Sequence, residues 1–264
     1  FLNDGTGSFE PGPEFGEISS VRSLTVADID CDGDLDLLST CRGRPNQIYL
    51  NSGDGHFASG KPFGNERDST IDVAVADFNG DGHLDLVLAN RDDQQNSILI
   101  NDGHLNFATA IPFGTQKEQT RAVAVGDLNG DEQPDIIAAN IGQSNRVYLS
   151  DGKGGFAATI GFGRADGSTY ALAVADMDND KDADLIVGNV GQQNAVFFNQ
   201  GDGKSYSEVR FGDASNATYG VDIADLNGDG FADIVVANSD AKNNVFLNRT
   251  ANSARKSRNS TTNK

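Results

Sequence analysis

Five acidic loops recur along this chain of 264 residues, and each reads Asp-x-[Asp/Asn]-x-Asp-x-x-x-Asp. They start at Asp28, Asp77, Asp127, Asp176 and Asp225, at steps of 49, 50, 49 and 49 residues. Carboxylates on alternate residues, bent round a turn, form the oxygen donor set that a hard cation such as Ca2+ prefers. Because no Cys and His ligand set accompanies them, the loops predict calcium rather than zinc.

The candidate ligands stand at positions one, three, five and nine of each loop, which predicts up to five Ca2+ ions, one per repeat. They are Asp28, Asp30, Asp32 and Asp36; Asp77, Asn79, Asp81 and Asp85; Asp127, Asn129, Asp131 and Asp135; Asp176, Asp178, Asp180 and Asp184; and Asp225, Asn227, Asp229 and Asp233. Seventeen of the 39 acidic residues occupy these positions. An isolated acidic turn could simply be solvated, but five copies in register favour metal binding.

The loops start like EF-hand loops but carry no Glu at position twelve, and an apolar strand follows each of them instead of a helix. Position six is Gly in repeats one, two and five, but it is Glu132 in repeat three and Lys181 in repeat four. A residue other than Gly is strained there if its φ is positive. We therefore expect repeats three and four to hold the weakest sites.

A regular period in this range indicates a repeat architecture, and each period contains four short strand patterns. In the second repeat these are residues 73–76, 84–89, 97–100 and 107–113, separated by the acidic loop and by Gly-rich or Asn-rich turns. An aromatic residue opens each fourth strand and Phe-Gly closes it, as in Phe113-Gly114. Four strands per unit are typical of a β-propeller blade, so the sequence predicts an all-β, five-bladed propeller of four-stranded antiparallel blades.

The predicted domain is a single propeller over residues 1–248, and residues 249–264 are predicted to be a disordered basic tail. The expected blades cover about residues 20–64, 69–114, 119–163, 168–212 and 217–248, the last completed by residues 1–16. The last repeat lacks a fourth strand pattern, whereas Ser8 to Phe15 has one without its first three strands. We therefore expect the N-terminal segment to close the ring and remove a sheet edge.

These repeats, such as residues 75–85 (Val-Ala-Asp-Phe-Asn-Gly-Asp-Gly-His-Leu-Asp) with Phe-Gly between them, resemble the FG-GAP/VCBS repeats of integrin α-subunit propellers and of many bacterial surface and secreted proteins. The resemblance covers residues 1–248. It implies a propeller with calcium in the loop between strands one and two of each blade. It also implies a secreted or cell-surface location and a role in adhesion. A fragment of a longer integrin-like propeller is the alternative to a closed ring of five blades.

The end of the propeller opposite the acidic loops is expected to bind the ligand, because basic and aromatic residues gather there. The candidate residues are Arg22, Arg121, Tyr170, Tyr219, Asp72 and Asp222. Arg and Tyr at the mouth of a central funnel suit an anionic or polyhydroxylated ligand. Ordinary polar surface loops would have a similar composition, so this assignment rests on position rather than on a motif.

The composition narrows the possible functions. A formal net charge of -19 argues against nucleic acid and an anionic membrane surface as partners. The sequence contains no run of 18 apolar residues, so it predicts no transmembrane helix. No catalytic motif is present, neither a Gly-x-Ser-x-Gly elbow nor a Cys–His pair, so the pattern favours a monomeric binding or adhesion module for a glycan or an extracellular protein. The alternatives are a secreted hydrolase or lyase acting at the funnel and a purely architectural domain.

Overall fold

The computed structural model describes residues 1–249, and their regular secondary structure is entirely β-strand. No helix that could span a membrane occurs in this part of the chain. The chain splits into two compact units, Phe1–Thr120 and Arg121–Lys264, which are described separately. The predicted tail, apart from Arg249, lies outside the described residues.

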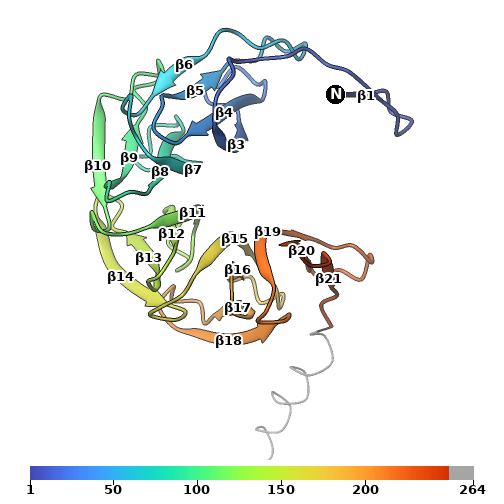
Figure 1. Ribbon diagram of the computed structural model, residues 1–264. Helices are drawn as coiled ribbons and strands as arrows, with labels where there is room; N and C mark the ends of the chain where they lie inside the picture. The colour runs from blue at the N-terminus through green and yellow to red at the C-terminus, as the bar shows by residue number, and fades with distance from the viewer. Residues whose placement is uncertain (250–264) are drawn as a thin grey trace, which may run out of the picture. The chain divides into compact units, whose positions relative to one another are not determined.

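The first unit contains a short hairpin and two four-stranded antiparallel sheets, blades one and two. The hairpin pairs β1 (Leu2–Asn3) with β2 (Phe9–Glu10). Blade one has β3 (Val21–Ala27), β4 (Asp36–Cys41), β5 (Asn46–Tyr49) and β6 (Lys61–Phe63). Blade two has β7 (Thr70–Ala76), β8 (Asp85–Asn90), β9 (Asn96–Ile100) and β10 (Thr109–Phe113). Within each blade the strands lie side by side in chain order, as Figure 1 shows.

The second unit contains blades three, four and five, and its boundary falls after the first residue of blade three. Blade three has β11 (Thr120–Gly126), β12 (Asp135–Asn140), β13 (Asn145–Ser150) and β14 (Phe156–Phe162). Blade four has β15 (Thr169–Ala175), β16 (Asp184–Asn189), β17 (Asn194–Asn199) and β18 (Tyr206–Phe211). Blade five has β19 (Ala217–Ala224), β20 (Asp233–Ser239) and β21 (Asn244–Phe246).

These five sheets are the blades of a β-propeller, so the predicted fold class is confirmed. In an antiparallel meander, the loops after the first and third strands lie at one end of the sheet. The acidic loops are therefore at the same end of each blade as the turns between strands three and four. The loops between strands two and three share the other end with the connections between blades.

The second strand of each blade supplies most of the core. β8, β12 and β16 are buried along their whole length. In the first unit Leu38 and Ile48 of blade one pack with Leu86 and Leu88 of blade two. In the second unit the same layering joins blade three to four and blade four to five. This burial explains why the second strand of each blade is almost entirely apolar in the sequence.

The N-terminal segment pairs differently from the prediction. Blade five has three strands, and β2, expected to be its fourth, pairs with β1 in a local hairpin. The turn of this hairpin explains the local pairing, because Asp4 Oδ1 accepts hydrogen bonds from the Thr6 amide at 2.8 Å and the Thr6 hydroxyl at 2.7 Å. Closure of a ring by residues 1–16 stays a prediction.

Farther along the segment, Phe15 packs on blade one in the same way that fourth strands pack elsewhere. Its ring lies 5.2 Å from that of Tyr49, edge-on, as the Phe162 ring lies 5.1 Å from that of Phe197. Gly16 has a φ of 74° and Gly163 a φ of 73°, so both glycines adopt a left-handed backbone conformation. Phe15-Gly16 therefore occupies the place on blade one that the end of a preceding strand four occupies on blade four.

Buried amide–hydroxyl hydrogen bonds also join neighbouring blades. In the second unit, Asn145 Nδ2 of blade three donates to Thr169 Oγ1 of blade four at 3.0 Å, and that hydroxyl donates to Asn189 Oδ1 at 2.8 Å. Asn46 with Thr70, Asn96 with Thr120, and Asn194 with Thr218 form the same bond at 2.8–3.0 Å. Val21 pairs with the end of β4 as Thr169 pairs with the end of β16, so blade one has no hydroxyl at this position.

Replacing the Thr169 hydroxyl should destabilise the second unit. Thr169→Val keeps the shape of the side chain but leaves a buried donor on Asn145 and a buried acceptor on Asn189 without partners, at a cost of roughly 1–3 kcal/mol. We expect the melting temperature to fall by several degrees in differential scanning calorimetry. Thr159→Val, at an exposed position of β14, is the control. Equal melting temperatures for the two variants would contradict the role of the hydroxyl.

Candidate metal centres and ligand face

The aspartate at position nine is the buried anchor of every acidic loop. Asp36, Asp85, Asp135, Asp184 and Asp233 are at most 1% exposed. In each, Oδ2 accepts the amide of the second loop residue at 2.8–3.0 Å. Oδ1 accepts the amide of the last residue of strand three of the blade, or of a residue one or two positions after it, at 2.7–2.8 Å. One carboxylate thus ties the loop to the neighbouring turn of the same blade.

The aspartate at position one shapes the loop itself. Its Oδ2 accepts the amide of position six at 2.8–3.1 Å in all five loops. The aspartate at position five accepts the amide of position seven at 2.9–3.0 Å. These turn-forming bonds leave each carboxylate with free lone pairs, since a carboxylate can accept about four hydrogen bonds or metal contacts.

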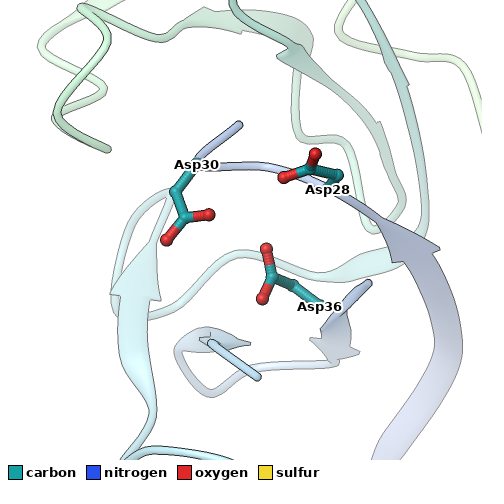
Figure 2. Close-up of side chains that lie close together, drawn as sticks. All are labelled: Asp28, Asp30 and Asp36. Carbon is teal, nitrogen blue, oxygen red and sulfur yellow. The ribbon is translucent and has the colours of Figure 1, made fainter. Parts of the chain in front are cut away.

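Three carboxylates converge in blades one and four. Oxygens of Asp28, Asp30 and Asp36 lie within 4.8 Å of one another, and Figure 2 shows the three side chains pointing into a shared space. The loop of blade four brings together Asp176, Asp178 and Asp184 in the same way. Both loops have Asp at position three, where the other three loops have Asn.

In two of the loops with Asn at position three, a hydrogen bond to the position-five aspartate replaces the repulsion between two carboxylates. Asn79 Nδ2 donates to Asp81 at 2.8 Å and Asn129 Nδ2 donates to Asp131 at 3.0 Å. The His83 amide and the Asn79 amide lower the pKa of Asp81. In blade one the opposite holds, because burial and the nearby Asp36 raise the pKa of Asp30. The Asp loops therefore have the greater need of a cation.

An unpartnered oxygen in blade four indicates where such a cation fits. Asp178 Oδ1 is buried and has no hydrogen-bond partner among the described residues. Burial and the adjacent Asp180 raise the pKa of Asp178. A buried polar atom without a partner is costly, and a divalent ion bound by oxygen ligands would satisfy it. The residues present thus fit a hard cation, which would supply positive charge to an otherwise repulsive cluster.

Position six of the acidic loop has a positive φ, the backbone conformation in which a residue other than Gly is expected to be strained. Glu132 has a φ of 63° and Lys181 a φ of 80°, where Gly33 of blade one has a φ of 96°. Both residues still donate their amides to the position-one aspartate, so the turn forms without Gly. Weaker metal binding in blades three and four stays a prediction. Blade four nevertheless gathers as many carboxylates as blade one.

Asparagines at the end of strand three, or just after it, connect to the acidic loop of the preceding blade, and the sequence reasoning missed them. Asn199 Nδ2 donates to the Leu128 carbonyl of the loop in blade three at 2.7 Å, and Asn248 Nδ2 to the Met177 carbonyl of the loop in blade four at 2.6 Å. In the first unit Asn101 reaches the Ile29 carbonyl at 3.5 Å. Their recurrence at the repeat period was the available signal.

The predicted ligand residues are only partly brought together. Within the second unit, Tyr170 and Tyr219 stack edge-on with centroids 4.9 Å apart, and the Arg121 guanidinium lies 5.6 Å from the Tyr170 ring centre. Arg22 and Asp72 lie on blades one and two in the first unit. Asp222 is exposed on β19, and its Oδ1 accepts a hydrogen bond from the backbone amide of the next residue, Ile223.

β-Bulges account for the direction of these side chains. The strand registers shift around Arg22, Tyr170 and Tyr219, each near the start of the first strand of a blade. Arg121 has the same position in β11. A bulge re-aims a side chain that the regular pleat would place elsewhere, and bulges are enriched beside functional sites. We call Arg121, Tyr170 and Tyr219 the Arg–Tyr row.

Calcium binding by the second unit should weaken in acid. Burial raises the pKa of Asp135 and of Asp184 to about 6 in the metal-free protein. A ligand carboxylate must lose its proton to bind metal, so protons compete below pH 6. We expect roughly tenfold weaker binding per site at pH 5 than at pH 7.5 in calorimetric titrations. Asp184→Asn should remove this dependence in blade four. Equal affinities at both pH values would contradict the assignment.

The comparisons with known proteins concern both family and fold. The model of the FG-GAP-like repeat matches residues 32–88, 77–138, 127–187 and 176–236. No curated protein sequence matches the chain. Two structures of BBS1N in complex with ARL6DN, soaked with mercury or lead, are 12% and 11% identical with TM-scores of 0.52 and 0.51. They cover 86% and 88% of this chain and 80% of theirs, and at such identity they show the fold alone.

The V. cholerae biofilm matrix protein Bap1 is also similar, at 20% identity and a TM-score of 0.48. The alignment covers 74% of this chain and 29% of Bap1, so the chain corresponds to less than a third of that protein. The likeness to Bap1 is too distant to carry an argument about function. The repeat matches, in contrast, run without interruption from residue 32 to residue 236. The chain therefore belongs to the FG-GAP-like repeat family.

Proposed function

We propose that this chain is a calcium-stabilised extracellular binding module that takes a glycan or a protein ligand at the end opposite its acidic loops. The observation that carries the proposal is the convergence of three carboxylates in each of two loops, one of them with a buried oxygen that lacks a partner. Calcium would neutralise these clusters and join metal binding to folding. A calcium-rich exterior suits loops of this kind, because extracellular modules bind Ca2+ at about 10⁻⁴–10⁻³ M.

The Arg–Tyr row supports the position of the ligand site. The three side chains come from adjacent blades of the second unit and lie near the starts of the first strands, away from the acidic loops. Tyr219 is 47% exposed, so part of an aromatic surface is available to a ligand. Arg and Tyr are enriched among residues that dominate binding energy. The row offers stacking and charge to a ligand, which suits a binding site.

Calcium should raise the melting temperature of the protein, and the size of the increase should depend on the position-three aspartates. Saturating one site at about 100 times its Kd contributes about 2.7 kcal/mol. We expect the melting temperature to rise by several degrees when Ca2+ replaces EDTA. Asp30→Asn and Asp178→Asn copy the residue that the other three loops already have, so both variants should fold.

These two variants should shift the melting temperature in opposite directions under the two conditions. In Ca2+ they lose a ligand and melt below the parent protein. In EDTA they lose a repulsive carboxylate and melt at or above it. An unchanged melting temperature of the parent in Ca2+ and EDTA would contradict structural calcium. If both variants lower the melting temperature by the same amount in Ca2+ and in EDTA, the aspartates have a purely structural role.

Substitution in the Arg–Tyr row separates the possible functions. We expect Arg121→Ala and Tyr170→Ala each to weaken ligand binding at least tenfold, the usual effect of truncating an energetically dominant contact residue. Binding can be screened on arrays of glycans and extracellular matrix proteins. Lys153→Ala, exposed in a turn at the opposite end of blade three, is the control. Loss of a turnover activity would favour the enzyme, unchanged binding in both variants would contradict the Arg–Tyr row as the ligand site, and no detectable binding by the parent protein would favour an architectural domain.

A further inference from the structure

A groove between blades three and four lies at the same end of the second unit as the Arg–Tyr row. It has a volume of about 460 Å3. Its walls come from the connection after β14, from the loop between β16 and β17, and from β18. The polar groups that face it include Arg164, Asp166, Gln192, Gln193, Glu208 and Arg210.

Two solvent-exposed Arg–carboxylate pairs line the groove. Arg164 donates through Nε and Nη2 to Asp166 at 2.9 and 3.0 Å. Arg210 donates through the same two atoms to Glu208 at 2.7 and 3.3 Å. Each guanidinium has five N–H groups and uses two of them here, and each carboxylate oxygen has a further lone pair. Both pairs therefore still offer donors beside acceptors.

Side-chain amides complete the polar lining, and their positions are fixed by hydrogen bonds to the backbone. Gln193 Nε2 donates to the Gly212 carbonyl at 3.0 Å, and Asn189 Nδ2 donates to the Gln193 carbonyl at 2.8 Å. Gln192 Nε2 reaches the Asp166 carbonyl at 3.4 Å. These bonds use the amide nitrogens of both glutamines, so each Oε1 remains an acceptor. Val187, Ala195 and Phe197 line the base of the groove and are at most 5% exposed.

The charge of the groove differs from that of the chain. Its two cations and two anions cancel, whereas the whole protein has a formal charge of -19. An anionic ligand would gain little from guanidinium groups that Asp166 and Glu208 already neutralise, and it would approach those carboxylates closely. An apolar ligand would leave the charged pairs without water or partners. Groups that donate and accept hydrogen bonds while carrying no charge would satisfy both Arg–carboxylate pairs.

The corresponding groove on blade one provides a contrast within the same protein. Phe15 and Gly16 there take the places of Phe162 and Gly163, and the cavity is about 550 Å3. Its cation, Arg44, forms no ion pair with any described residue, and its acids, Glu14 and Glu17, are likewise outside the ion pairs of the described chain. Paired donors and acceptors thus distinguish the groove of blades three and four from the groove of blade one.

We propose that the groove between blades three and four binds a neutral polyhydroxylated ligand, a short uncharged oligosaccharide. Adjacent sugar hydroxyls, each a donor and an acceptor, would bridge an Arg N–H and a carboxylate or Gln oxygen. This inference rests on the proposed binding function and names the ligand class for that end of the molecule. The site is separate from the Arg–Tyr row, so the two can be tested independently.

The test measures binding of four tetrasaccharides by isothermal titration calorimetry. Cellotetraose, mannotetraose and chitotetraose are neutral, and tetragalacturonate is anionic. We expect at least one neutral tetrasaccharide to bind and the anionic one to bind at least tenfold more weakly. The double variant Glu208→Gln and Arg210→Gln keeps the charge of the groove and its approximate volume, and should weaken neutral binding at least tenfold. Arg44→Gln in the groove of blade one should leave it unchanged.

The outcomes separate this proposal from the proposed function. Neutral binding that survives the double variant but is lost in Arg121→Ala would overturn the groove and leave the binding function standing. Tighter binding of tetragalacturonate would overturn the charge argument. If none of the four sugars binds but an extracellular protein does, the groove proposal is wrong and the binding function holds. Melting temperatures near that of the parent protein confirm that the variants are folded.

Discussion

The whole structure depends on a buried carboxylate that accepts two backbone amides in every blade. The position-nine aspartate ties the acidic loop to the turn after strand three, and both of its oxygens are used in doing so. Burying a charge is expensive unless hydrogen bonds or another charge compensate it. Two amides compensate only in part, since burial still raises the pKa of Asp135 and Asp184 to about 6. A cation beside this carboxylate would complete the compensation, which links loop geometry to metal chemistry.

The same residues also connect neighbouring blades. The second residue of the loop donates its amide to the position-nine aspartate, and its carbonyl accepts an asparagine amide from the following blade in the pairs Leu128–Asn199 and Met177–Asn248. Buried Asn–Thr bonds at the other end of the blades add a second link. Apolar second strands fill the space between these two polar layers. A change in an acidic loop should therefore affect the contact between blades as well as the loop.

The blades and their acidic loops could be predicted from the sequence because both follow from local patterns repeated at a fixed spacing. The run from Leu84 to Ala89 indicated a strand covered on both faces, and β8 is buried along its length. The pairing of Phe9 could not be predicted, because the local Asp4 turn and a distant sheet edge compete for the same strand. Position in the repeat placed Arg121, Tyr170 and Tyr219 together, but it could not show that Arg22 and Asp72 belong to a different unit.

The groove residues were beyond the reach of sequence reasoning for a different reason. Gln192 and Gln193 resemble any polar loop, and the pairing of Arg210 with Glu208 depends on the pleat of β18, where alternate residues share a face. Such a site arises only when two blades are packed together.

The central claim is that the carboxylate clusters of blades one and four bind calcium. Native mass spectrometry of the protein in calcium, with and without Asp30→Asn and Asp178→Asn together, counts the bound ions directly. At least two ions on the parent protein, and fewer on the double variant, is the predicted result. A parent protein that binds no calcium at millimolar concentration would contradict the account.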